Sequence, residues 1–198
     1  SIFAVMLGLK LATDPRWVNL AEKSIEEILT DHAYCEQKAT SSNIALIQLY
    51  PEKQWMVDKL VPVVQEEWMH FKLVLDELKK RGMQLGPQRK DAYVAALQDF
   101  TQKGGRKEER FLDRLLMNAL IEARSCERFR LLSLYISDDS LRDFYHKLMV
   151  AEATHYRLFL DIAEKYFDKE KVQERWTQWL EYETNVMKNM ELRGDRMH

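Results

Sequence analysis

Two apolar helical stripes in this chain are each interrupted by a glutamate and, three residues later, a histidine. Burying a carboxylate without a partner is costly, so a glutamate on the inward face of a helix needs a partner, and a metal ion is one that fits. The spacing Glu-x-x-His places both side chains on one side of the helix, where they can hold the same ion. The stripes are Leu60, Val64, Glu67, His70, Phe71, Val74 and Leu78, and Leu141, Phe144, Leu148, Glu152, His155, Phe159 and Ile162.

A single Glu-x-x-His is weak evidence in a chain rich in glutamate, and a lone buried histidine is more often a core residue than a ligand. Two inward-facing copies are much stronger evidence. Asp143 and His146 have a similar spacing and serve as a control. Asp143 lies nine residues before Glu152, and nine steps of about 100° place it on the opposite face of the helix. We therefore expect Asp143 and His146 to be solvated.

The pattern along the chain predicts helices and few strands, and only six Gly and four Pro occur in 198 residues. Two long hairpins joined by a crossover of about 25 residues are the connectivity of a ferritin-like four-helix bundle. The sequence therefore predicts an all-α fold of this kind with an additional C-terminal helix. The expected helices cover 16–49, 53–81, 91–102 in the crossover, 107–137, 139 or 140 to 167, and 169–192.

Local signals set the expected ends of these helices. Thr13-Asp14-Pro15 is typical of a helix start, and Asp139 or Ser140 is expected to cap the helix that follows the second turn. Pro62 either bends the second helix or marks a later start. The tail from Gly194 is expected to fray.

Composition favours a single domain over residues 1–198, with enough chain for a hydrophobic core. The net charge of −2 excludes a polycation, so nucleic-acid binding would require a local patch. Two cysteines, Cys35 and Cys126, do not make a disulfide scaffold, which favours a reducing cytoplasm. The apolar opening of about a dozen residues is shorter than the roughly 20 needed to span a membrane.

The hairpin geometry selects a carboxylate from each partner helix. Residues equidistant from an antiparallel turn lie at the same height; Glu36 and Glu67 each lie about 15 residues from the first turn. Glu122 and Glu152 have the same relation to the second turn. Glu127 is the alternative to Glu122, but it would lie about 7 Å out of the plane of the other predicted ligands. The predicted metal ligands are Glu36, Glu67, His70, Glu122, Glu152 and His155.

Carboxylates with one histidine per metal suit iron or manganese better than structural zinc. The remaining polar residues near this set favour ordinary structural roles. His32 is expected to be either a core residue or a residue that supports the ligands, rather than a ligand itself. Cys35 and Cys126 are expected to be small buried residues beside the site, with a redox pair as the alternative. Tyr34 and Tyr156 flank ligand positions and either pack or relay electrons.

A basic run covers residues 103–110 and could form a cluster with Arg124, Arg128 and Arg130. Such a run is usually a solvated loop and helix start. The alternative is contact with a phosphate backbone, for which this cluster is the best candidate although acidic residues interrupt it.

The residues around the predicted ligands resemble those of the bacterial tRNA 2-methylthio-N6-isopentenyladenosine hydroxylases, the MiaE-like family. The similar segments are DHAYCEQKA, EEWMHF, LIEARSCERF and AEATHYRLF, and the resemblance extends from about Leu9 to Leu192. It implies a non-haem di-iron monooxygenase of the cytoplasm, with two iron ions held by the six ligands named above. The implied substrate is a modified adenosine beside the anticodon of tRNA, hydroxylated on its isopentenyl group.

The resemblance also implies O2 and an external electron donor as partners, since no G-x-G-x-x-G motif for a flavin or nicotinamide is present. The sequence leaves monomer and dimer open. The alternative functions are iron storage or a rubrerythrin-like peroxidase on the same di-iron site, although no Cys-x-x-Cys iron domain is present. A metal-free helical interaction protein is the third hypothesis.

Overall fold

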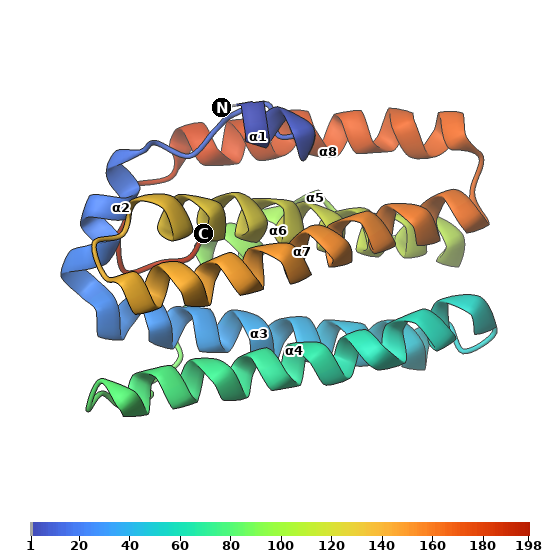
Figure 1. Ribbon diagram of the computed structural model, residues 1–198. Helices are drawn as coiled ribbons and strands as arrows, with labels where there is room; N and C mark the ends of the chain where they lie inside the picture. Colours follow the sequence, from blue (N-terminus) through green and yellow to red (C-terminus); the bar gives the residue numbers. More distant parts are fainter. Residues whose placement is uncertain (1) are drawn as a thin grey trace. The chain divides into compact units, whose positions relative to one another are not determined.

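The structure is a computed structural model that describes residues 2–198, and within that range it contains helices and no strand. The prediction of an all-α fold is therefore confirmed (Figure 1). The helices are α1 (Ile2–Met6), α2 (Arg16–Ala21), α3 (Ile25–Leu49), α4 (Gln54–Lys80), α5 (Ala92–Phe100), α6 (Lys107–Tyr135), α7 (Asp139–Tyr166) and α8 (Lys169–Asn189), with a 3-10 turn at Glu22–Ser24. None of the helices in this range is long and apolar enough to cross a membrane.

The chain divides into two compact units. The α3–α4 unit comprises residues 19–90 and 193–197. The α6–α8 unit comprises the residues up to 18, residues 91–192 and residue 198. Each unit contains one of the two predicted long hairpins.

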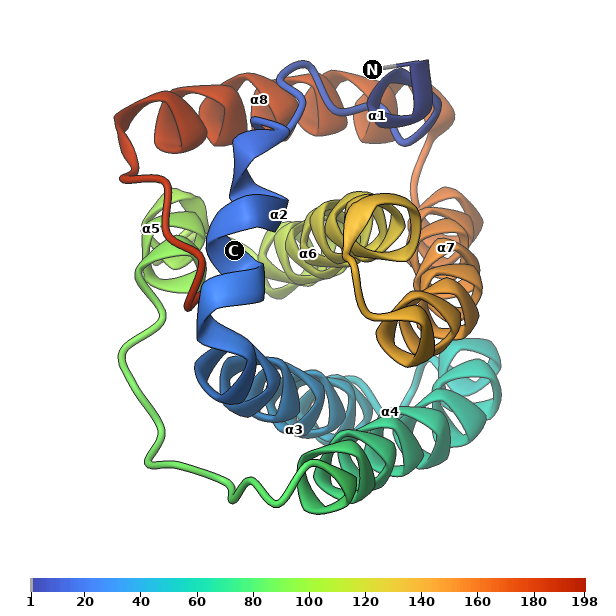
Figure 2. The same cartoon turned by 60° about the vertical axis from the view of Figure 1, so that its left-hand side comes forward.

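In the α3–α4 unit, the two helices pack side by side and are joined by a short turn (Figures 1 and 2). Pro62 is exposed and lies inside α4, which begins at Gln54, so the alternative of a later helix start is wrong. The prediction of one continuous helix over 16–49 is also wrong. The 3-10 turn interrupts it, and Ser24 leaves the helical region at φ −137° and ψ 44°.

The tail of the chain packs onto this interruption and does not fray. A Cβ built at Gly194 would lie 2.2 Å from the carbonyl carbon of Leu20, so only glycine fits there. Asp31 on α3 accepts a hydrogen bond from Arg196 Nη1 at 2.8 Å and another from the Met197 backbone N–H at 2.7 Å. These contacts explain why the expectation of a frayed end is wrong.

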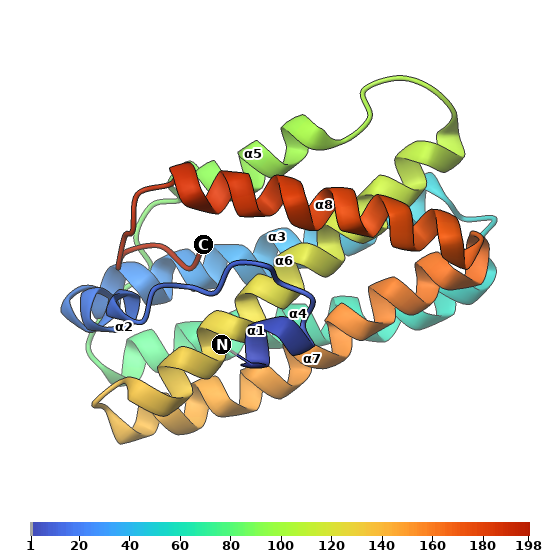
Figure 3. The ribbon, with the colours of Figure 1, turned by 90° about the horizontal axis from the view of Figure 1, so that it is seen from above.

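In the α6–α8 unit, α6 packs along α7, and α8 lies against α5 and α6 (Figure 3). Asp138, rather than Asp139 or Ser140, caps α7, because its Oδ1 accepts a hydrogen bond from the Leu141 N–H at 3.0 Å. Asp91 caps α5 in the same way through Val94 at 3.0 Å. Each long hairpin thus presents one continuous buried face, and the predicted ligands lie on those faces.

Candidate metal centre

Three predicted ligands meet inside the α3–α4 unit. Glu36 on α3 and Glu67 and His70 on α4 are all buried, and one donor atom from each lies within 4.8 Å of the others. His70 Nδ1 is 3.7 Å from Glu36 Oε2 and 3.6 Å from Glu67 Oε2. We call these residues the α3–α4 triad.

Charge in the α3–α4 triad is balanced by histidine. Burial alone would raise the pKa of Glu36, but hydrogen bonds to His32 and His70 outweigh burial and hold that pKa well below its usual range. Burial would lower the pKa of His70, yet the carboxylates of Glu36 and Glu67 raise it to about 10. The triad therefore favours a cation between its two carboxylates, which is the environment that a divalent metal requires.

His32 supports this triad from the preceding turn of α3. Its ring is fully buried, and its Nε2 lies 2.6 Å from Glu36 Oε1. A histidine one turn away that fixes a carboxylate orients that carboxylate toward the remaining side chains. The supporting position expected for His32 agrees with this contact.

The matching set lies inside the α6–α8 unit. Glu122 on α6 and Glu152 and His155 on α7 are buried, and one donor atom from each again lies within 4.8 Å of the others. We call these residues the α6–α7 triad. Asp143 and His146, the control pair, are both exposed, as the helical angle predicts.

Glu127 belongs to a separate buried hydrogen-bond network with Thr13 and Arg124. Its Oε1 accepts a hydrogen bond from the Thr13 backbone N–H at 2.8 Å, and its Oε2 accepts from the Thr13 hydroxyl at 2.6 Å and from Arg124 Nη1 at 2.6 Å. Both oxygens of Glu127 are therefore committed to buried partners. This pattern favours Glu122 over Glu127 as the α6 ligand.

The sequence did not predict Glu183, the second carboxylate partner of Arg124 in this buried network. Glu183 on α8 is fully buried and accepts hydrogen bonds from Arg124 Nε at 2.8 Å and Nη2 at 2.6 Å, as well as from the Tyr93 hydroxyl at 3.2 Å. The available signal was a glutamate in the packing stripe of α8, one turn beyond Trp179 and two turns beyond Trp176.

The basic cluster suggested by the sequence does not form. Arg124 and Arg128 are buried, and Arg128 lies over the Trp17 ring at 4.6 Å. Arg130 lies over the ring of Phe3 at 4.4 Å. Arg124 and Arg128 share one buried face of α6, whereas Arg130 lies on another face, so the three cannot make one exposed patch with the 103–110 loop.

The other residues near the ligands have structural contacts. The Cys126 thiol donates to the Met149 carbonyl at 3.4 Å, and burial raises its pKa to about 12. The Tyr34 hydroxyl donates to the Gly86 carbonyl at 3.0 Å. The Tyr156 ring centroid lies 6.3 Å from that of Trp176.

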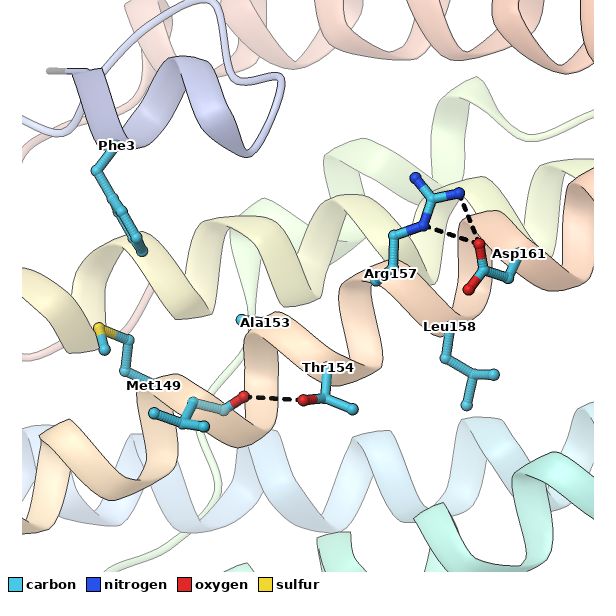
Figure 4. A pocket seen from close by; sticks show the side chains of 8 residues that line it. Phe3, Met149, Ala153, Thr154, Arg157, Leu158 and Asp161 are labelled. Atoms are coloured by element: carbon cyan, nitrogen blue, oxygen red, sulfur yellow. Dashed lines mark hydrogen bonds and ion pairs between the residues drawn. The ribbon is translucent and has the colours of Figure 1, made fainter.

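A shallow groove of about 600 Å³ runs along the outer side of α7 (Figure 4). Phe3 from α1 covers one side, and Arg157 Nε donates to Asp161 Oδ1 at 2.8 Å at one end. Asp161 lies nine residues after Glu152, so the groove faces away from the α6–α7 triad. The groove and the triad are therefore separate features of α7.

The donors suit iron. Each triad supplies two carboxylates and one imidazole and no thiolate. Such oxygen-rich sets with one nitrogen match iron or manganese, whereas structural zinc sites favour Cys and His. Burial of two carboxylates in each hairpin is hard to explain without a cation.

Comparisons with known proteins agree with these features. A family model described as tRNA-(MS2IO6A)-hydroxylase (MiaE) matches residues 2–198. The tRNA 2-(methylsulfanyl)-N(6)-isopentenyladenosine(37) hydroxylase of Pseudomonas putida is 34% identical over 157 residues, which cover 79% of this chain and 75% of that protein. The hydroxylase of the same name from Salmonella typhimurium is 26% identical over 216 residues, which cover 81% of this chain and 77% of that protein.

The fold also matches a solved structure. Protein 43 with aldehyde deformylating oxygenase activity, from Synechococcus, aligns with a TM-score of 0.90 and 34% identity over 96% of this chain and 94% of that one. The match confirms the predicted ferritin-like helical bundle. The family match over residues 2–198 and the relative from Pseudomonas putida show that this chain belongs to the MiaE family of tRNA hydroxylases.

Proposed function

We propose that this chain is a di-iron monooxygenase that hydroxylates the isopentenyl group of 2-methylthio-N6-isopentenyladenosine in tRNA. The observation that carries the proposal is the pair of buried triads, each with two carboxylates and one histidine. The relatives from Pseudomonas putida and Salmonella typhimurium carry the name of this activity. Family membership and the donor chemistry support the same assignment.

Both triads would belong to one dinuclear centre, so that the two compact units would work as one domain. Glu36, Glu67 and His70 would hold one side of the centre, and Glu122, Glu152 and His155 the other. Ferritin-like di-iron proteins use a Glu from each of two helices and Glu-x-x-His from each of the other two, and this chain supplies that set.

Residues around the triads would orient the ligands and exclude water from them. His32 fixes Glu36, and the buried apolar residues one turn from the ligands, Val63 and Val74 on α4 and Leu148 and Phe159 on α7, keep water from the ligand positions. The two irons, when bound, would supply activation of O2 for insertion of one oxygen atom into an allylic methyl C–H bond. An external donor would supply the electrons, and the reaction would take place in the cytoplasm with tRNA.

The direct test uses iron-loaded protein, a chemical reductant, O2 and tRNA from a strain that makes the isopentenylated nucleoside but lacks its hydroxylase. Mass spectrometry of the digested tRNA should show a gain of one oxygen on the modified adenosine. Glu67→Gln should abolish the product, and Glu66→Gln, at the exposed neighbouring position, should retain it. Absence of product with the iron-loaded wild type, or full activity of Glu67→Gln, contradicts the proposal.

A further inference from the structure

One buried side chain on α3 has polar atoms that the protein does not satisfy. Asn43 is 1% exposed, and neither its Oδ1 nor its Nδ2 has a hydrogen-bond partner among residues 2–198. Leaving a buried amide unsatisfied is costly, so such a group usually has a partner that completes its hydrogen bonds. The nearby Thr40 is different, because its hydroxyl donates to the Glu36 carbonyl at 2.9 Å within the helix.

The position of Asn43 relates it to the α3–α4 triad. It lies seven residues after Glu36, which places both on the same face of α3, about 10 Å apart along the axis. His32, Glu36, Thr40 and Asn43 form a continuous buried polar stripe. Polar residues continue along this face of α3 beyond Glu36. A helix that packed only against a hydrophobic core would be apolar at these positions.

The register of the hairpin shows which residues of α4 lie opposite Asn43 of α3. Because Glu36 lies opposite Glu67, Asn43 lies at the height of Leu60, and Val63 lies between that height and Glu67. Leu60 and Val63 are 0% and 5% exposed. The face therefore offers a carboxamide at one end, an apolar wall beside it and the triad at the other end.

We propose that Asn43 is a specificity-determining residue whose carboxamide hydrogen-bonds the N6–H and the adjacent ring nitrogen of the prenylated adenine, an inference that rests on the proposed function. The N6 atom of this nucleoside keeps one hydrogen, so its edge presents one donor beside one acceptor. An Asn carboxamide matches such an edge with its oxygen and its NH₂ group. Val63 would contact the isopentenyl chain.

The dimensions of the substrate agree with this placement. The terminal methyl of the isopentenyl group is four bonds from N6, or about 5 Å. A hydrogen bond from Asn43 adds about 3 Å to that length. The methyl then lies within a few ångströms of the height of Glu36, where the chemistry would occur.

The test compares two nucleosides on the iron-free protein and then on the iron-loaded enzyme. The first probe is 2-methylthio-N6-isopentenyladenosine, and the second is its analogue with oxygen in place of the N6–H group. Binding to the wild type, measured by calorimetry, should be about 10- to 100-fold weaker for the oxygen analogue. Asn43→Leu should bind both probes equally, and weakly. With iron-loaded enzyme and prenylated tRNA, Asn43→Leu should raise KM by a similar factor with little change in kcat.

Two further variants separate this role from a structural one. Thr40→Val removes a hydroxyl that is already bonded within α3, so it should keep the discrimination between the nucleosides. Asn43→Asp keeps an acceptor for the N6–H and should therefore keep part of the discrimination between the two nucleosides. Equal binding of the two nucleosides by the wild type, or unchanged discrimination in Asn43→Leu, overturns the inference even if the enzyme hydroxylates tRNA. A wild type that hydroxylates no tRNA refutes the proposed function instead.

Discussion

Arg124 and Glu127 form a buried ion pair, with 2.6 Å between Arg124 Nη1 and Glu127 Oε2, and the two side chains are 0% and 3% exposed. Both residues belong to α6, three positions apart, and Thr13 adds two more hydrogen bonds to Glu127. A carboxylate held in this way cannot turn toward a metal without leaving a buried guanidinium short of a partner. The pair therefore gives Glu127 a role in stability and favours Glu122 as the proposed metal ligand.

Replacing Glu127 should reduce stability more than iron binding. Glu127→Ala should lower the free energy of unfolding by about 3 kcal/mol, because it removes one partner of a buried charge. Glu127→Gln, which keeps an acceptor, should lower it less. Chemical denaturation of the iron-free protein measures both effects. Iron content per folded chain should stay at the wild-type value in Glu127→Gln, and its loss there would favour Glu127 as a ligand.

The two pairs with Glu/Asp-x-x-His spacing on α7 provide a matched comparison. Glu152→Gln and His155→Ala should each lose iron, because both residues lie buried in the α6–α7 triad. Asp143→Asn and His146→Ala should keep it, since both residues are exposed. Metal analysis after anaerobic loading with ferrous iron measures all four. Equal iron content across the set would contradict the assignment of this face of α7.

The two cysteines should differ in reactivity. Burial raises the pKa of the Cys126 thiol to about 12, so the thiolate is scarce at pH 8, whereas Cys35 is partly exposed. Only the thiolate reacts with iodoacetamide. Mass spectrometry after brief alkylation of the folded protein should therefore find Cys35 modified and Cys126 intact, with both modified in denaturant. Rapid alkylation of Cys126 in the folded protein would show that this part of α6 opens readily.

The tail contributes stability that depends on pH. Asp195 is held by Arg193 and Arg89, which lower the pKa of its carboxyl well below the usual range. A carboxyl with a depressed pKa in the folded protein stabilises it above about pH 4, and this contribution is lost as pH falls through the folded pKa.

Asp195→Asn should therefore cost about 0.5–1 kcal/mol at pH 7, a value reduced by partial solvent exposure. Denaturation of wild type and variant at pH 7 and at pH 2–3 measures the difference, which should shrink at the lower pH. A difference that is constant with pH would show that the ion pairs at Asp195 do not stabilise the tail.

Periodicity and hairpin symmetry were enough to predict the elements that hold the candidate ligands. Glu36 opposite Glu67 and Glu122 opposite Glu152 follow from counting residues from each turn, because an antiparallel pair of regular helices fixes the register. The solvated faces of Asp143 and His146 follow from the helical angle alone. These features depend only on local geometry.

The features that sequence reasoning missed depend on long-range contacts. The break at Ser24 coincides with packing of Gly194 against Leu20, which are distant in sequence. The hydrogen bonds from Thr13 to Glu127 join residues that are 114 positions apart. The alternative of a basic cluster is wrong because Arg124 lies in the interior, where it donates to Glu183 on another helix. No local pattern encodes such partners.

The measurement that tests the central claim most directly is the iron content and magnetic state of protein loaded anaerobically with ferrous iron and then oxidised. The account predicts about two irons per chain in a coupled pair that gives no EPR signal, with Glu67→Gln and Glu122→Gln each disrupting the pair. Two independent ferric signals, each lost with the variant of its own triad, would show two separate metal sites. That result, or no bound iron, would contradict a single dinuclear centre shared by the two hairpins.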